Sequence, residues 1–148
     1  ENSKLDLISA KNSVLLLVDY QPNMFKGVKS TEPNKKCGTC GCNSSIDTDV
    51  PVVYTSIWPD GNGEFIKELT DIFPKQEVIA RAILGFDAFE EEKLLSVVKA
   101  TGRKKLIVSG LWTSLCFAYT ALNATREGFD VYGLMDAGGR DASNMFPG

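Results

Sequence analysis

The cysteines are the residues of this sequence best suited to covalent chemistry. Cys116 stands alone in an apolar segment, whereas Cys37, Cys40 and Cys42 lie within six residues of one another. A thiol acts as a nucleophile at neutral pH when a positive neighbour, a helix N-terminus or a base favours its thiolate. The chain has no histidine, which excludes Ser-His-Asp and Cys-His catalysis and any histidine-ligated metal site. Cys116 is therefore a candidate nucleophile whose base must be another type of residue.

The three clustered cysteines match no complete motif. Their spacing is not that of a secreted disulfide framework. Three thiolates can bind zinc or copper when a fourth ligand comes from elsewhere, but the full four-ligand pattern is absent. We expect a disordered loop and no metal site here, and a metal or redox role for Cys37, Cys40 and Cys42 is the alternative.

Short apolar segments alternate with helical patterns along the chain, and this order predicts the fold. Residues 13–20 (SVLLLVDY) form an apolar run closed by Asp19, as in a parallel strand buried on both faces. Four further strands are predicted over 51–57, 77–80, 104–109 and 130–135. Helices are predicted over 64–73, 89–101 and 113–127. The alternation predicts a Rossmann-like three-layer α/β/α sandwich with a mostly parallel sheet. Such sheets carry their active sites at the carboxyl ends of the strands, where Asp19 and Cys116 both fall.

Length and charge narrow the classes of function. With 148 residues, 43% of them hydrophobic, the chain is expected to form a single domain over residues 1–148. The net charge of −3 comes without a basic stripe, which argues against a nucleic-acid partner. No apolar run approaches the roughly 20 residues of a membrane helix, and no signal-peptide pattern is present. We expect a cytoplasmic protein with no membrane partner.

Residues 35–49 lie where a helix between the first two strands is expected, but they are rich in poor helix formers, and we have no physical account of this stretch.

Three stretches of the chain carry a family resemblance. They are VLLLVDYQ over 14–21, EVIARAILGFDAF over 77–89, and KKLIVSGLWTSLCFAYTALNATREGFDVYGLMDAGG over 104–139. On these motifs the chain resembles the isochorismatase-like cysteine hydrolases, and within them the YcaC-related amidohydrolases. The resemblance implies the same α/β fold and a homo-oligomer, commonly a large ring of subunits. If the chain ends at Gly148, the helix and strand that normally follow in the family are missing.

The resemblance also implies a catalytic triad of Asp19, Arg81 and Cys116. Cys116 would attack a small amide or carbamoyl substrate to form a thioester. Asp19 would accept the thiol proton and pass it to the leaving amine, because Arg81 stays charged and cannot shuttle protons. The family has a non-proline cis peptide before the nucleophile's helix, which would fall at or near Leu111 and Trp112. True isochorismatases lack the cysteine, and nicotinamidase relatives hold a metal with histidines, so we expect an amidohydrolase without cofactor or metal.

Further residues are expected around the triad. Backbone N–H groups near Leu111 and Trp112, with those of the helix that begins at residue 113, are candidates for the oxyanion hole. Trp112 and Phe117 are expected to line the substrate site, and Phe86 is expected in the pocket wall or the core.

Each triad residue also has a structural interpretation without catalysis. Cys116 can be an inert core residue, Asp19 a turn former, and Arg81 an exposed charge or a subunit salt bridge. The rival function is accordingly a catalytically silent scaffold or binding protein that kept the fold.

Overall fold

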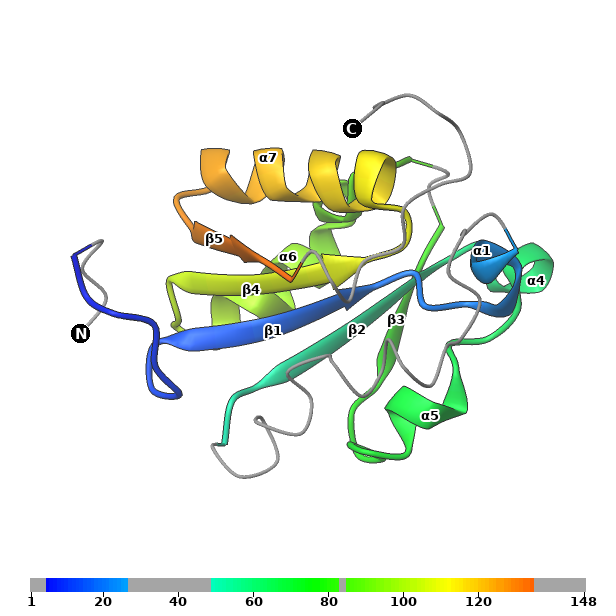
Figure 1. Cartoon of the computed structure of the whole chain (residues 1–148), viewed down its shortest axis with the longest axis horizontal. Coiled ribbons are helices and arrows are strands. Elements are labelled where there is room, and N and C mark those ends of the chain that lie inside the picture. Colours follow the sequence, from blue (N-terminus) through cyan, green and yellow to red (C-terminus); the bar gives the residue numbers. More distant parts are fainter. Residues whose placement is uncertain (1–4, 27–48, 83–84, 135–148) are drawn as a thin grey trace.

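The computed structural model describes residues 5–26, 49–82 and 85–134 of the chain. In this part of the chain, strands form one sheet in the order β3-β2-β1-β4-β5, and all neighbouring pairs are parallel. The strands are β1 (Ser13–Val18), β2 (Val52–Ile57), β3 (Val78–Arg81), β4 (Lys105–Gly110) and β5 (Asp130–Gly133). Figure 1 shows them side by side with β1 in the middle.

β1 is the central strand because its sequence tolerates burial on both faces. All six of its residues are buried, and five of them are Val or Leu. The strand pairs with β2 on one side and with β4 on the other, so both edges of its backbone are hydrogen-bonded within the sheet. The chain therefore leaves β1, and enters Asp19, at the middle of the carboxyl edge of the sheet.

Helices cover both faces of the sheet, as the three-layer prediction requires. α6 (Glu92–Ala100) and α7 (Ala118–Arg126) lie on one face, and α5 (Lys67–Thr70) lies on the other (Figure 1). Two short helices, α1 (Pro22–Phe25) and α4 (Pro59–Asn62), contact each other beyond the carboxyl ends of β1 and β2. The predicted α/β/α sandwich is confirmed.

The predicted elements are present with shifted bounds. All five predicted strands are found, but the helix predicted over 64–73 narrows to α5. The helix predicted over 89–101 begins as a 3₁₀ turn, η1 (Ala88–Glu90), before α6. The helix predicted over 113–127 begins as a π-helical turn, η2 (Thr113–Phe117), and continues as α7. Propensity alone does not separate these helix types, since all of them share the same local pattern of side chains.

Some predictions concern residues outside the described part of the chain. Cys37, Cys40 and Cys42 are among them, so the role of that stretch stays a prediction. Among the helices that the structure does describe, none has the length and apolar character needed to cross a membrane.

Gly110 sets the distance between β1 and β4 at the carboxyl edge of the sheet. It pairs with Val18, and a Cβ placed on it would lie 2.9 Å from the Val18 Cβ and 3.1 Å from the Val18 carbonyl oxygen. The next residue, Leu111, donates its N–H to the same carbonyl at 3.1 Å. The absence of a side chain at Gly110 therefore lets the two strand ends that lead to Asp19 and to Cys116 lie close together.

We expect Gly110→Ala to lower the free energy of unfolding by about 1–3 kcal/mol, because the new methyl group overpacks a fixed backbone. The same variant should change the alkylation rate of Cys116, since it separates the two strand ends. Urea unfolding and mass spectrometry measure the two effects.

Gly102→Ala is the matched control. Gly102 has open space around its Cβ position but a φ of 68°, so alanine there strains the backbone without a clash. It should lower stability and leave the reactivity of Cys116 unchanged. An effect of Gly110→Ala on stability alone would show that this contact does not position the site.

Candidate active site

Asp19 is buried at the first position after the central strand. Its side chain has no exposed surface, and its backbone adopts a φ of 60°, a left-handed conformation that aspartate tolerates better than most residues. Its N–H donates to the Thr55 carbonyl at 2.9 Å, and its own carbonyl accepts from Gln21 N–H at 2.8 Å. The turn at the end of β1 is thus fixed by backbone hydrogen bonds on both sides of the carboxylate.

Arg81 reaches Asp19 across the intervening strand. Its Nη2 donates to Asp19 Oδ2 at 2.9 Å, and its Nη1 donates to Thr55 Oγ1 at 3.2 Å. Thr55 Oγ1 donates in turn to the Ile79 carbonyl at 2.9 Å. The ion pair is almost completely buried, with side-chain exposures of 1% and 0%. A buried pair of this kind is stable only when hydrogen bonds hold both partners, and β2 supplies one of them.

Cys116 lies in η2, on the side of the sheet that carries α7, and is 2% exposed. Its thiol and the Asp19 carboxylate are close enough for each to change the pKa of the other. Even so, Asp19 Oδ1 and Arg81 Nε have no hydrogen-bond partner of normal geometry in the described residues. The expected cis peptide is present between Leu111 and Trp112. The structure therefore brings the three predicted residues Asp19, Arg81 and Cys116 together, and in the described residues Asp19 Oδ1 has no well-formed hydrogen bond.

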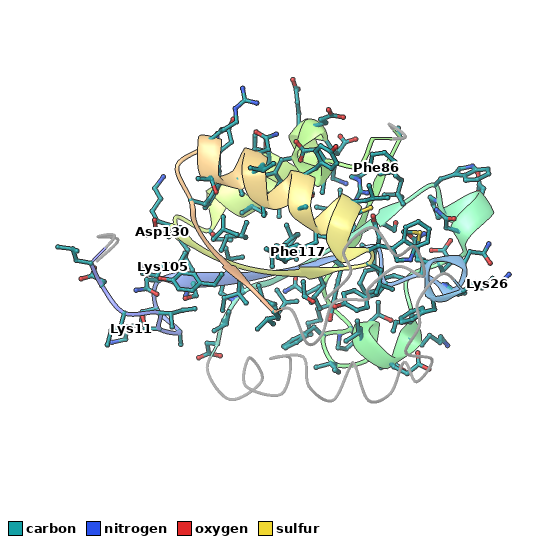
Figure 2. All side chains as sticks on the ribbon, turned by 45° about the horizontal axis from the view of Figure 1, so that its top comes forward. Lys11, Lys26, Phe86, Lys105, Phe117 and Asp130 are labelled. Atoms are coloured by element: carbon teal, nitrogen blue, oxygen red, sulfur yellow. The ribbon has the colours of Figure 1, made fainter. Side chains whose placement is uncertain are left out.

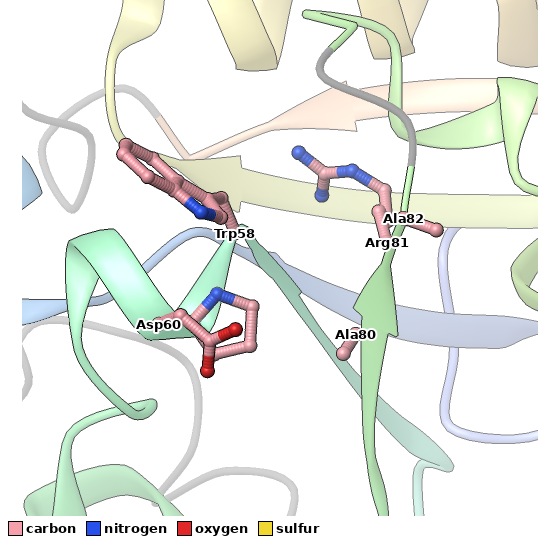
Figure 3. Close-up of a pocket in the computed structure, with 6 residues that line it drawn as sticks. Trp58, Asp60, Ala80, Arg81 and Ala82 are labelled. Carbon is pink, nitrogen blue, oxygen red and sulfur yellow. The ribbon is translucent and has the colours of Figure 1, made fainter.

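A cleft of about 320 Å³ opens beside Arg81. It lies between the ends of β2 and β3, and is lined by Trp58, Pro59, Asp60, Ala80, Arg81 and Ala82 (Figure 3). From the sequence, neither Pro59 nor Asp60 was singled out as a site residue. The available signal was their place directly after a predicted strand, at the edge where parallel sheets bind ligands.

The family of this fold and site follows from comparison with known proteins. The sequence matches the family model described as Isochorismatase domain over residues 13–143. The chain belongs to the isochorismatase family. The match includes all three residues of the buried cluster.

Relatives within this family resemble the chain over most of its length. It is 34% identical over 135 residues to "Probable hydrolase YcaC" of Escherichia coli (strain K12), which covers 89% of this chain and 64% of that protein. The chain thus spans about two thirds of that relative's length. The crystal structure of the YcaC gene product from E. coli, an octameric hydrolase of unknown specificity, superposes with a TM-score of 0.83 over 93% of this chain and 69% of that one. YcaC from Pseudomonas aeruginosa, with hexane-2,5-diol and covalent acrylamide, gives 31% identity and a TM-score of 0.83 over 94% and 70%.

Burial is the largest influence on the pKa values of Asp19 and Cys116 in this isochorismatase-family protein. It raises the pKa of the Asp19 carboxyl, although the charge and hydrogen bond of Arg81 and the nearby Cys116 thiol lower it. Burial also raises the pKa of the Cys116 thiol to about 12, helped by the Asp19 carboxyl close to it. The charge of Arg81 and the backbone of Trp112 lower the pKa of the thiol, but by less.

This direction is opposite to the one suggested by a positive neighbour and a helix start near Cys116. Both features are present, but burial of the thiol outweighs them, and the negative charge of Asp19 beside Arg81 adds to the rise in pKa. The resting site therefore holds a neutral thiol beside the Asp19 side chain that pairs with Arg81. A site in this state relies on its base during the attack and not on a preformed thiolate.

The other predicted site residues take different positions. Leu111 is fully buried, and its N–H is already donated to Val18. Trp112 donates its indole N–H to the Met24 carbonyl at 2.7 Å. Phe117 packs against the core, while Phe86 is 52% exposed and stacks on Tyr119 at 6.1 Å between ring centroids (Figure 2 labels Phe86 and Phe117). None of the four predicted residues lines the cleft, so their roles in substrate binding stay predictions.

Metal ligands do not gather in the described part of the chain. It contains no group of three or more Asp, Glu, Cys or His residues placed to hold a metal ion.

We expect Asp19→Asn to lower the pKa of Cys116, because the variant removes the negative charge that raises it. The midpoint of the pH dependence of Cys116 alkylation should fall by at least about one pH unit. In the wild type, the alkylation rate should still be rising at pH 10. Site-resolved mass spectrometry on the folded protein measures both profiles.

Asp71→Asn, which removes an exposed carboxylate on the turn after α5, is the control for the loss of one negative charge. It should leave the midpoint in place. A midpoint that stays constant or rises in Asp19→Asn would contradict the electrostatic coupling of the carboxylate and the thiol.

Proposed function

We propose that the chain is a cysteine hydrolase that cleaves a small amide or carbamoyl substrate through a thioester on Cys116. The observation that carries the proposal is the buried Asp19–Arg81 pair next to the Cys116 thiol, in which Arg81 holds Oδ2 while Oδ1 has no well-formed hydrogen bond in the described residues. A carboxylate held at one oxygen and free at the other can receive and return a proton without moving.

In the first half of the reaction, the sulfur of Cys116 attacks the substrate carbonyl carbon as its proton passes to Asp19 Oδ1. The carbonyl oxygen becomes an oxyanion, for which backbone N–H groups at the start of η2 are the available donors. Leu111 N–H is not among them, since it is bound to Val18. Asp19 then gives the proton to the leaving nitrogen, the C–N bond breaks, and the thioester remains.

In the second half, Asp19 is again a carboxylate and accepts a proton from water as the water attacks the thioester. Collapse of the second tetrahedral intermediate breaks the C–S bond, and the proton returns to the sulfur. Arg81 keeps its charge throughout and fixes Oδ2, so that the same oxygen of Asp19 serves both halves. The raised pKa of Asp19 suits a group that must both accept and donate a proton.

The relatives support this proposal at a coarser level. The E. coli relative is a probable hydrolase, and the P. aeruginosa relative was obtained with covalent acrylamide, an electrophile that modifies nucleophilic side chains. The observation that favours the rival, a catalytically silent scaffold, is the burial of Cys116 with its raised pKa.

The proposal predicts that a panel of small primary amides and carbamoyl compounds includes a substrate from which the protein releases ammonia. Cys116→Ala should lower kcat by about 10³-fold or more, because it removes the nucleophile. Coupled ammonia detection measures turnover, and circular dichroism checks that the variant stays folded.

Cys116→Ser is the matched variant, since it keeps the size of the side chain but weakens the nucleophile. Both variants should remain folded and inactive. Turnover by Cys116→Ala at the wild-type rate would remove Cys116 from the mechanism, and the absence of turnover with every amide would favour the silent scaffold.

We also propose that the protein assembles with copies of itself. The E. coli relative is octameric, and α7 exposes apolar side chains, Tyr119 at 50% and Leu122 at 64%, with Phe86 stacked on Tyr119. Exposed apolar groups gathered in this way are typical of protein interfaces.

Sedimentation velocity should therefore show a species larger than the monomer, and Leu122→Lys should shift it toward smaller species. Val97→Lys, on the exposed side of α6, is the matched control and should leave the distribution unchanged. A wild-type protein that is monomeric at every concentration would contradict the proposal.

A further inference from the structure

Trp58 is an exposed aromatic residue held in an unusual backbone conformation. Its side chain is 54% exposed, and its φ of 43° lies in the left-handed region. A bulky residue rarely adopts this conformation, and it persists only where the surrounding structure imposes it. Burial does not explain the arrangement, because the residue is 54% exposed. The exposed face of the indole therefore requires another explanation.

The turn around Trp58 is built to hold the indole in place. The ring lies against Gly61, where an added Cβ would meet three ring carbons at 2.5–2.6 Å. The Trp58 carbonyl accepts hydrogen bonds from the N–H groups of Gly61 at 3.0 Å and Asn62 at 2.9 Å. One side of the indole is thus seated on backbone, and the ring forms a wall of the cleft (Figure 3).

Gln21 fixes this turn to the strand that carries Asp19. Its side-chain Nε2 donates to the Ile57 carbonyl at 3.0 Å and to the Gly63 carbonyl at 2.7 Å, and its Oε1 accepts from Ile57 N–H at 2.9 Å. Gln21 is fully buried and only two residues from Asp19. The aromatic wall and the buried carboxylate are therefore held in one rigid arrangement.

The charges around the cleft favour a cation at its outer end. Arg81 lines the cleft, but its charge is balanced by the ion pair with Asp19. Asp60 also lines it, and within the described residues this carboxylate makes no ion pair or hydrogen bond through its side chain. The charges of Arg81, Asp19 and Asp60 therefore add up to one net negative charge, which is that of Asp60. A tryptophan face and an unpaired carboxylate both attract cations.

We propose that this cleft binds a cationic group, an ammonium or alkylated ammonium, at the non-reacting end of the substrate. The inference rests on the proposed hydrolase function, and it names the substrate class as small amides that carry a positive charge remote from the scissile bond. The cation lies on the Trp58 face beside Asp60. The amide end lies toward Arg81, which lines the inner end of the cleft and pairs with Asp19.

An isosteric series tests the binding preference without any need for turnover. Tetramethylammonium, tert-butanol and pivalate have similar shapes and carry a positive, zero and negative charge. The chain has two tryptophans, so its indole N–H resonances in ¹H–¹⁵N spectra are readily assigned with Trp58→Phe. Tetramethylammonium should shift the Trp58 resonance with a Kd at least about five-fold lower than that of tert-butanol, and pivalate should bind more weakly still.

Two variants assign the preference to the cleft. Asp60→Asn should raise the Kd of tetramethylammonium at least about three-fold, whereas Asp71→Asn, which removes an exposed carboxylate away from the cleft, should not change it. Equal binding of the neutral compound, preferential binding of pivalate, no shift at Trp58, or equal effects of the two variants would each overturn the proposal.

A second measurement links the cleft to Cys116. Acrylamide, the cationic (3-acrylamidopropyl)trimethylammonium and the anionic 2-acrylamido-2-methylpropane sulfonate share one electrophile and differ in charge. The cationic reagent should alkylate Cys116 at least about five-fold faster than the anionic one, and Asp60→Asn should reduce the ratio. An equal ratio in wild type and variant would mean that the cleft does not guide substrates to the thiol.

The two hypotheses fail in different ways. If no acrylamide modifies Cys116 and no amide is hydrolysed, the proposed function fails, while the titration of Trp58 still decides whether the cleft selects cations. If amides are hydrolysed without preference for a positive charge, the hydrolase proposal stands and the cation site is refuted.

Discussion

The ion pair between Asp19 and Arg81 is the interaction on which the rest of the site depends. Its partners come from the ends of β1 and β3, and the Thr55 hydroxyl on β2 between them holds the guanidinium. Removal of either partner would leave an unpaired charge in a buried position, which typically costs about 3–5 kcal/mol. The parallel order of the strands brings these three side chains to one edge of the sheet, and Gly110 keeps β4, which leads to Cys116, close to the same edge.

The same pair explains how a thiol with a raised pKa can still be useful. A guanidinium next to a sulfur normally favours the thiolate, but here its charge is used to orient a carboxylate. In the proposed mechanism, Asp19 Oδ1, which has no well-formed hydrogen bond in the described residues, is the base. The raised pKa keeps the thiol protonated at neutral pH, a form that is less prone to oxidation than the thiolate.

The sequence predicted the sheet well because β1 and its neighbours are continuous apolar runs, a pattern that only burial between two layers explains. Asp19 and Cys116 were found from the same pattern, since each follows a predicted strand at the edge where such sheets bind ligands. Arg81 was different: its contact with Asp19 depends on the strand order β3-β2-β1, which alternation of strands and helices does not specify. It was identified only through the family resemblance. The direction of the thiol pKa was not predictable, because it depends on how deeply three charges are buried together.

Other features were missed for equally physical reasons. The π-helical start of the nucleophile's helix shares its side-chain pattern with an α-helix. Trp58 was passed over because its role depends on a left-handed backbone and a glycine three residues later, which together look like an ordinary turn in the sequence. Gln21 showed no signal beyond its place in a family motif, although its amide binds three backbone groups of another segment.

The seating of Trp58 on Gly61 has a consequence for the ways in which this protein can diversify. The turn is held by the contact of the Trp58 ring with Gly61 and by the hydrogen bond from Gln21 to the Gly63 carbonyl. Asp60 lines the cleft and takes no part in these contacts. Position 60 can therefore exchange its charge during evolution or in a designed library at little structural cost. Position 61 admits only glycine as long as the indole remains. Under the proposed cation site, single substitutions at position 60 would change the substrate preference while the turn that carries the residue keeps its conformation.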